Sequence, residues 1–316
     1  MLLSCLAVYV FGAMVLNRQA LESKLLQQLL AHPELDFDIW SDARLLQSIR
    51  ETLKQQSSKE LWIFAYGSLI WNPIFHYSDR CLVRLENWQR RFCMLAPVGR
   101  GTIDNPGLVL GLMPSEGSYC EGIAYRLPID ENTESELLLL WRREMVVGSY
   151  IPSFIFGKNG DRTLLETPRY PKVYPLGRRQ AQTKAIRFAA CNAPIDSRYT
   201  DKPCNGNGGN LAPVPSTEDT SATDWLRTDK LHKGFSRMYD NALSRNLEVL
   251  TFVVDSQHST YVNWSDEKIV ESLATAKGSL GSSAEYLCNT VRGLLKAGIE
   301  DKELIELDNL VKEKQQ

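Results

Sequence analysis

The sequence predicts an α+β fold, with strands concentrated in the middle of the chain and helices near both ends. Three observations lead to this prediction. Short apolar runs bounded by turn residues occupy residues 61–127, leucines recur at helical spacing before residue 56, and capped helical patterns follow residue 264. The composition, 43% hydrophobic and 23% charged over 316 residues, is that of an ordinary folded protein.

Residues 1–16 are almost wholly apolar. A membrane-spanning helix needs about 20 such residues, so this run is short. A signal peptide begins with positive charges and ends at small residues, and neither feature is clear here. Three interpretations stay open: a segment upstream of the functional start, a weak membrane anchor, or a packed helix. We expect no membrane association unless residues 1–16 act as an anchor.

Two amphipathic helices are predicted next, over residues 18–32 and 43–55. Their apolar residues recur three or four positions apart: Leu21, Leu25, Leu26, Leu29 and Leu30, then Leu45, Leu46, Ile49 and Leu53. Such faces either pack onto a core or contact a partner, and both interpretations stay open. We therefore divide the chain into an N-terminal apolar segment with a helical extension, 1–60, and a main domain, 61–316.

The strands of the main domain are predicted from apolar runs. These runs cover residues 61–66, 80–85, 107–113, 120–127, 185–190 and 249–255. The polar stretch 199–224, rich in Gly, Asn, Pro, Ser and Thr, predicts a long loop or a disordered insert. Because loops of this length are uncommon inside compact domains, we expect an insertion at about residues 157–246.

The strongest helical pattern in the middle of the chain spans residues 133–147. Thr133 and Glu136 have the spacing of a capping box, and Gly148 follows as a stop signal. Three more helices are predicted near the C-terminus: residues 265–278, residues 282–298 and a last helix that begins at Asp301.

Charge and metal-ligand content exclude several classes of protein. The 36 Lys and Arg against 38 Asp and Glu create no overall attraction to nucleic acid, and we expect no such partner. The four histidines are far apart and the seven cysteines contain no C-x-x-C pair, so no zinc site or disulfide framework is predicted. This cysteine usage favours a reducing, cytoplasmic location. Motifs of P-loop, dinucleotide-binding, serine hydrolase and zinc protease sites are absent.

One candidate site is the turn formed by Tyr66, Gly67, Ser68 and Leu69 after the first apolar run. A strand that ends in a Gly-Ser turn presents consecutive backbone N–H groups. Such a nest can hold a carboxylate or an oxyanion. A plain turn without a binding role is the alternative.

The second candidate is Glu144, which falls on the apolar stripe of the helix predicted at 133–147, three residues after Trp141. A carboxylate is rarely buried on such a face without a partner or a function. Desolvation would raise its pKa and make it a usable general base. A structural ion pair with Arg142, Arg143 or a distant arginine is the alternative.

Together these residues resemble the ChaC family of γ-glutamylcyclotransferases, in particular its glutathione-specific group. The signature Y-G-S-L-I-W-N-P stands intact at residues 66–73. Further matching segments follow in the family's order: 90–93 (R-R-F-C), 100–102 (R-G-T), 106–112 (P-G-L-V-L-G-L), 122–126 (G-I-A-Y-R), 141–145 (W-x-R-E-M), 250–253 (L-T-F-V), 276–278 (A-K-G) and 285–287 (E-Y-L). The resemblance covers about residues 61–150 and 247–311.

The resemblance implies a mixed β-barrel with flanking helices that acts on γ-glutamyl compounds without a metal or cofactor. The substrate would be glutathione, and the products 5-oxoproline and Cys-Gly. Carried over residue by residue, the turn at Tyr66, Gly67, Ser68 and Leu69 would cradle the γ-glutamyl group, and Glu144 would be the catalytic carboxylate. Tyr286 and Arg100 match shorter segments and would contribute to substrate binding.

The sequence departs from the family pattern in three places. About 60 residues precede the signature, the stretch between Tyr150 and Leu247 is longer than usual, and Val147 stands where Thr or Ser is common. Two other functions stay open: a cyclotransferase for other γ-glutamyl amines or amino acids, and a non-catalytic binding or transport-regulating module. The sequence predicts no particular oligomeric state.

Overall fold

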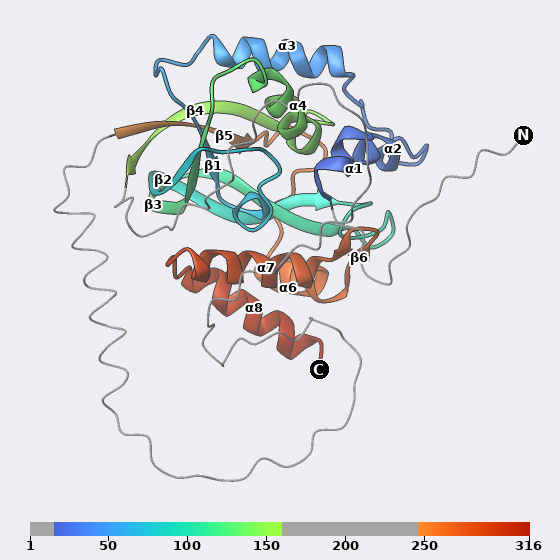
Figure 1. Ribbon diagram of the computed structural model, residues 1–316. Helices are drawn as coiled ribbons and strands as arrows, with labels where there is room; N and C mark the ends of the chain where they lie inside the picture. The colour runs from blue at the N-terminus through green and yellow to red at the C-terminus, as the bar shows by residue number, and fades with distance from the viewer. Residues whose placement is uncertain (1–15, 160–245) are drawn as a thin grey trace, which may run out of the picture. The chain divides into compact units, whose positions relative to one another are not determined.

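A closed barrel of five strands forms the centre of the structure, with helices packed around it (Figure 1). This computed structural model describes residues 16–159 and 246–316. Most neighbouring strands are antiparallel, while β5 runs parallel to β1 and β3, so the barrel is mixed. The predicted α+β class with a mixed barrel is confirmed. The apolar start, the strand predicted at 185–190 and the polar insert at 199–224 lie outside the described residues.

Two long strands, β2 (Asp79–Ala96) and β3 (Gly107–Leu127), form a hairpin that makes much of the barrel wall. Register shifts in β2 at residues 86–88 and 92–94 mark β-bulges, which bend a strand and increase its twist. The bulges therefore allow the hairpin to curve around the core. Each of three shorter strands predicted from the sequence lies within this hairpin: 80–85, 107–113 and 120–127.

The strands β1 (Leu61–Ala65) and β5 (Asn246–Val254) confirm the predictions at 61–66 and 249–255. All five residues of β1 are buried, as expected for a strand that is apolar on both faces. In the strand order β1-β3-β2-β4-β5, the parallel contact between β1 and β5 closes the barrel.

The sequence does not predict β4 (Tyr150–Asn159). Its apolar run contains Pro152, and a proline within a run argues against a strand because it cannot donate a ladder hydrogen bond. In the structure Pro152 stands opposite Phe252 in an antiparallel pairing with β5 that extends from Tyr150 to Lys158. Tertiary pairing therefore overrides the local signal.

The N-terminal helices are α1 (Arg18–Glu22), α2 (Leu25–Leu30) and α3 (Asp42–Leu53). The prediction of one continuous helix over residues 18–32 is wrong. Lys24 adopts a left-handed φ of 58°, a conformation that an α-helix of L-residues does not contain, and the chain breaks there into two short helices.

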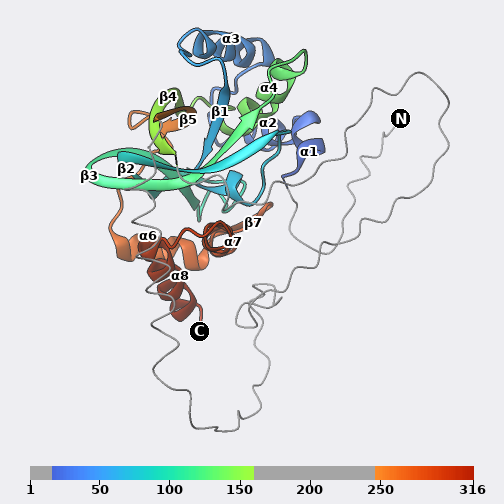
Figure 2. The ribbon, with the colours of Figure 1, turned by 60° about the vertical axis from the view of Figure 1, so that its left-hand side comes forward.

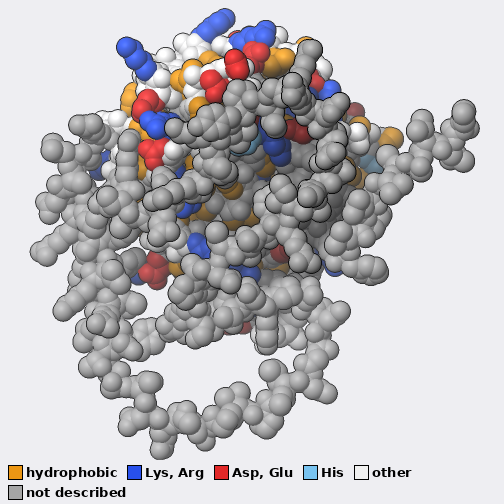
Figure 3. Space-filling view, in the orientation of Figure 1, with side chains coloured by type: hydrophobic (Ala, Val, Ile, Leu, Met, Phe, Trp, Pro, Cys, Tyr) orange, Lys and Arg blue, Asp and Glu red, His pale blue; other side chains and the backbone are white. Residues whose placement is uncertain are grey.

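The apolar faces of α1 and α3 pack against α4. Leu21, Leu45 and Ile49 are fully buried and belong to the same hydrophobic cluster as the barrel strands. The opposite face of α3 is charged. Figure 3 shows Lys and Arg side chains interspersed with Asp and Glu over the end of the molecule where α3 lies. This pattern is typical of an amphipathic helix on a protein surface.

The helix α4 (Thr133–Glu144) begins where predicted but ends earlier. The predicted capping box is wrong. The N-cap is Asn132, whose side chain makes no capping bond, and the Thr133 hydroxyl bonds to Asp130 instead. The Glu136 carboxylate turns away from the helix start because it bonds to other elements.

The C-terminal helices α6 (Asp266–Thr275), α7 (Ser283–Lys296) and α8 (Lys302–Lys314) pack together on one side of the barrel (Figure 2). The predicted starts of the last two are confirmed. Ser282 accepts a hydrogen bond from the Glu285 N–H at 3.0 Å, and Asp301 caps α8 in the same way.

The helix α6 ends before Gly278, where the sequence predicts its stop. Gly278 lies instead in β6 (Lys277–Gly278), which pairs with β7 (Gly281–Ser282) to lead directly into α7. Within residues 16–159 and 246–316, no helix is both long and apolar enough to cross a membrane.

Candidate active site

A cavity of about 300 Å³ lies where β1 ends, and its lining includes residues of the barrel, α4, α7 and the N-terminal helices. All the site residues expected from the sequence line this cavity: Tyr66, Gly67, Ser68, Leu69, Arg100, Glu144 and Tyr286. They come from four separate stretches of the chain. The fold therefore brings to one place residues that the sequence identifies only separately.

The turn after β1 is a short 3₁₀ helix, η1 (Ser68–Ile70). The Ile70 N–H donates to the Gly67 carbonyl at 3.0 Å, which closes the turn. The N–H groups of Ser68 and Leu69 stand at the start of this helix, where no helical carbonyl precedes them as an acceptor. Because both residues line the cavity, these donors can bind a carbonyl or carboxylate oxygen there.

Gly67 allows the turn to approach α7 closely. A Cβ atom at this position would lie only 3.0 Å from the Tyr286 hydroxyl oxygen. The Tyr286 ring is itself held edge-on by Trp71 and Phe92, with ring centroids 6.3 and 5.9 Å away. A side chain at residue 67 would therefore have to displace a well-packed tyrosine.

Glu144 is the last residue of α4, and its side chain is 17% exposed. Burial raises the pKa of this carboxyl group, and the Arg143 guanidinium partly opposes the shift. A carboxylate with a raised pKa accepts a proton more readily near neutral pH than an exposed glutamate does. Glu144 therefore has the properties of a general base.

Arg143 connects Glu144 to the turn. Its Nε lies 3.1 Å from Glu144 Oε1, Nη1 donates to the Asn72 carbonyl at 2.8 Å, and Nη2 donates to Ser68 Oγ at 2.7 Å. The side chain is only 6% exposed. The ion pair considered from the sequence as an alternative to a catalytic role is thus present, and it belongs to the site.

Three buried tyrosines surround the carboxylate. Burial raises the pKa values of Tyr66, Tyr150 and Tyr286, and the charge of Glu144 raises them further. The Tyr66 hydroxyl donates to the Phe252 carbonyl at 2.8 Å, and the Tyr150 hydroxyl donates to another backbone carbonyl at 3.3 Å. These tyrosines therefore stay neutral near pH 7 and act as fixed polar groups around the carboxylate.

Arg100 lies in the turn between β2 and β3, and its side chain is 15% exposed. Its Nη1 is 3.7 Å from Glu285 Oε2, a long ion pair, and its guanidinium carbon is 5.6 Å from the Tyr286 ring centre. Burial lowers its pKa, but an arginine remains charged at neutral pH. Within residues 16–159 and 246–316, Glu285 is thus the one anionic partner of Arg100, and it is distant.

Several residues that line the cavity were not predicted from the sequence. Tyr150 was missed together with β4, and Asn289 lies on α7 among residues that the pattern assigns only to packing. Leu26 and Leu30 of α2 also line the cavity. Their apolar spacing indicates a buried face, but nothing in it indicates which surface that face covers.

Comparison with known proteins identifies the family. The model of ChaC-like proteins matches residues 61–167 and 213–314. An Escherichia coli (strain K12) protein named glutathione-specific gamma-glutamylcyclotransferase is 38% identical over 164 residues, which cover 50% of this chain and 69% of the relative. The human glutathione-specific gamma-glutamylcyclotransferase 1 is 38% identical over 234 residues, which cover 74% of this chain and 84% of the relative.

The fold has a counterpart among solved structures. The crystal structure of a gamma-glutamyl cyclotransferase specific to glutathione from yeast aligns with a TM-score of 0.51 and 18% identity, over 81% of this chain and 97% of the other. This likeness confirms the cyclotransferase-like barrel. Because the family model also matches more than half of the sequence, the chain belongs to the ChaC-like protein family.

Proposed function

We propose that this chain is a glutathione-specific γ-glutamylcyclotransferase that uses Glu144 as general acid and base. The observation that carries the proposal is the environment of Glu144: a largely buried carboxylate with a raised pKa, held by Arg143 beside the turn at Ser68. The names of the Escherichia coli and human relatives support the same activity.

The first chemical step is a proton transfer. The α-amino group of the γ-glutamyl moiety is mostly protonated at neutral pH, and an ammonium group has no lone pair with which to attack. Glu144 accepts one proton from it. The freed nitrogen then attacks the δ-carbonyl carbon of the same γ-glutamyl group, and a five-membered ring closes.

The second step releases the amine. Negative charge develops on the former carbonyl oxygen, and the N–H groups of Ser68 and Leu69 are the donors in the cavity that can stabilise it. The bond between the δ-carbon and the cysteinyl nitrogen breaks, and protonated Glu144 returns its proton to that nitrogen. The ring nitrogen still carries two hydrogens, so Glu144 takes up one of them and passes it to the released amine, which becomes an ammonium group. The products are 5-oxoproline and Cys-Gly, so the atoms balance without water or a redox partner.

Much of the rate enhancement comes from the conformation of the bound substrate. The reaction is intramolecular, so a site that holds the γ-glutamyl chain folded brings the amine against the carbonyl. The zwitterionic ends of glutathione need charged or hydrogen-bonding partners. Arg100 is suited to bind a substrate carboxylate, because its own ion pair with Glu285 is long.

The test is a 5-oxoproline assay with glutathione on the wild type and the Glu144→Gln variant. We expect wild-type turnover and a loss of about 10²- to 10⁴-fold in the variant, the usual contribution of a general acid–base residue. The melting temperature of the variant should remain close to that of the wild type. Full activity in a folded Glu144→Gln protein would eliminate this mechanism.

The same chemistry would act on other γ-glutamyl amines if the cavity accepted them. A comparison of glutathione with γ-glutamyl-alanine separates a glutathione-specific enzyme from a broader one. Tight binding of glutathione without turnover of any γ-glutamyl compound would instead identify a binding module.

A further inference from the structure

We call residues 16–40, the first described residues of the chain before α3, the N-terminal wall. They lie outside the part of the chain that the family model matches, which begins at residue 61. Four apolar side chains of this wall line the cavity that contains Glu144: Leu16, Leu26, Leu30 and Phe37. The wall is therefore part of the site and not only a cover for the barrel.

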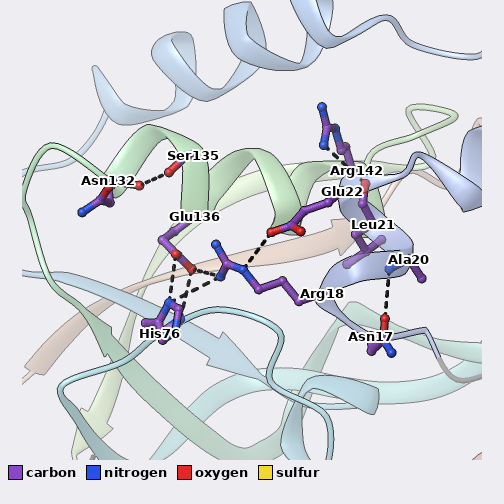
Figure 4. A network of polar contacts seen from close by, with 10 residues as sticks. All are labelled: Asn17, Arg18, Ala20, Leu21, Glu22, His76, Asn132, Ser135, Glu136 and Arg142. Atoms are coloured by element: carbon purple, nitrogen blue, oxygen red, sulfur yellow. Dashed lines mark hydrogen bonds and ion pairs between the residues drawn. The ribbon is translucent and has the colours of Figure 1, made fainter. Parts of the chain in front are cut away.

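The start of the wall is fastened to the catalytic helix α4. Arg18 Nη1 donates to Glu136 Oε2 at 2.8 Å, and the same carboxylate accepts the His76 backbone N–H at 3.1 Å. Figure 4 shows Glu136 between Arg18 on α1 and His76 on the segment before β2. Arg18 also bonds to Glu22 within α1 at 3.0 Å. One buried carboxylate thus holds three elements together.

A second attachment lies next to the catalytic carboxylate. Arg142, two residues before Glu144, donates to both carboxylate oxygens of Asp42 at 3.0 and 2.9 Å and to the Leu21 carbonyl at 3.3 Å. Lys24 Nζ lies 2.6 Å from the same carboxylate. The bidentate pair restricts both distance and angle, so the start of α3 is held in a defined position against the end of α4. The bond to the Leu21 carbonyl joins α1 to the same guanidinium.

The two ends of the wall are attached to the site by backbone groups. The Asn72 side chain, which follows the turn η1, donates to the Leu16 carbonyl at 2.8 Å. The Trp40 N–H donates to the Val146 carbonyl at 2.8 Å, just beyond α4. Both segments that carry the reacting groups are therefore joined directly to the wall.

We propose that the N-terminal wall is a specificity-determining surface that contacts the side chain of the leaving amine, a proposal that rests on the proposed function. The γ-glutamyl end carries an ammonium and a carboxylate, and desolvating either against leucine and phenylalanine would cost far more than hydrogen bonding it elsewhere. That end therefore faces the turn and Glu144. The apolar wall suits the uncharged CH₂–SH group of a cysteinyl residue.

The experiment compares two substrates that differ only in this group: glutathione and γ-glutamylglycylglycine. Leu26→Ala and Phe37→Ala each remove part of the wall's apolar surface, and both residues are half-buried rather than in the core. We expect each variant to lower the preference for glutathione, measured as the ratio of the two kcat/KM values, by about tenfold. Leu29→Ala is the matched control, since Leu29 is half-buried in the same helix α2 but does not line the cavity.

Equilibrium binding of the two compounds, measured by calorimetry on the same proteins, separates failure of the wall proposal from failure of the proposed function. A wild type that binds but never turns over would overturn the proposed function, while a shifted binding ratio in Leu26→Ala and Phe37→Ala would still support the wall. The proposal for the wall would be overturned if the ratio of glutathione to γ-glutamylglycylglycine stayed unchanged in both variants. It would also be overturned if Leu29→Ala shifted that ratio equally. Absence of binding to the wild type would overturn it as well.

Discussion

The Arg143 guanidinium and the Glu144 carboxylate lie 3.1 Å apart on consecutive residues at the end of α4, and Arg143 reaches across to the turn at the same time. All three of its nitrogens contact residues of the cavity region. The arrangement keeps the Glu144 carboxylate and the N–H donors of the turn at a set separation before any substrate binds. It also limits how far burial can raise the pKa of Glu144.

The first prediction concerns the pH dependence of the reaction. Arg143 lowers the pKa of Glu144 against the effect of burial, so removing its charge in Arg143→Gln raises that pKa further. A general base works only when deprotonated, and the acidic limb of kcat/KM therefore moves to higher pH. The measurement is kcat/KM for glutathione across the pH range in which the protein stays folded.

Arg142→Gln is the control for this prediction. Arg142 is the neighbouring residue on the same helix, but its guanidinium binds Asp42 and not Glu144. We expect its acidic limb to keep the wild-type position, whatever happens to the absolute rate. If the acidic limb of kcat/KM stays at the wild-type pH in Arg143→Gln, the ion pair between Arg143 and Glu144 does not control the protonation of Glu144.

The second prediction tests the close approach of the turn to α7. In Gly67→Ala, the new methyl group meets the Tyr286 hydroxyl oxygen at 3.0 Å, while its other neighbours are at ordinary contact distances of 3.7 Å or more. We expect kcat/KM to fall about tenfold or more, since small displacements of positioning groups have large effects. Tyr286→Phe removes the hydroxyl oxygen that the new methyl group would contact.

A double-mutant cycle measures this contact. If the steric conflict is the cause, Gly67→Ala costs clearly less in the Tyr286→Phe background than in the wild type. Equal losses in both backgrounds would instead locate the effect in the conformation of the turn. Assays of the four proteins with the same substrate, with melting curves for each, complete the cycle.

Local sequence signals predicted those parts of the fold that depend on neighbouring residues. Ser282 and Asp301 cap their helices as expected. Each side chain accepts a hydrogen bond from the backbone N–H three residues later, so the cap needs no distant partner. The break at Lys24 had no such signal, since lysine gives no indication of a left-handed conformation. The strand β4 was missed because long-range pairing outweighs the presence of Pro152.

In the candidate site too, the features set by neighbouring residues were predicted and those set by distant contacts were not. Glu144 was identified from its position on an apolar stripe, which is a local property of the helix. The three contacts of Arg143 depend on how α4 meets the turn, and a pattern along the chain cannot express them. The Glu136 carboxylate was assigned to a local cap, but in the folded protein Arg18 and His76 are its partners.

The third prediction concerns Arg100. In Arg100→Gln, the substrate loses a cation that Glu285 holds only at 3.7 Å. We expect KM for glutathione to rise about tenfold with a smaller change in kcat, the pattern for an interaction made equally in the ground state and the transition state. Arg91→Gln is the control, because Arg91 is 37% exposed and contacts Trp264 and Asp266 away from the cavity. A fall in kcat at unchanged KM would contradict a binding role.

The last prediction is a pH-dependent loss of stability in Glu136→Gln. Burial alone would raise the pKa of Glu136, but hydrogen bonds from Arg18 and His76 outweigh it and lower the pKa below its usual value. A carboxyl group with a lowered pKa in the folded state stabilises the fold above its unfolded pKa, about 4.3, and this contribution disappears as the pH falls through the folded value.

At pH 7 we therefore expect Glu136→Gln to lower the free energy of unfolding by about 2 kcal/mol, the range for hydrogen bonds to a charged group. The difference from the wild type should shrink as the pH falls below about 4.3, because the wild-type carboxylate is then protonated too. Urea unfolding at a series of pH values measures it. Glu134→Gln, in the first turn of the same helix, is the control: its pair with Arg50 is exposed, and such pairs contribute little. A stability difference that stays constant with pH would show that the Glu136 charge does not hold α1 to α4.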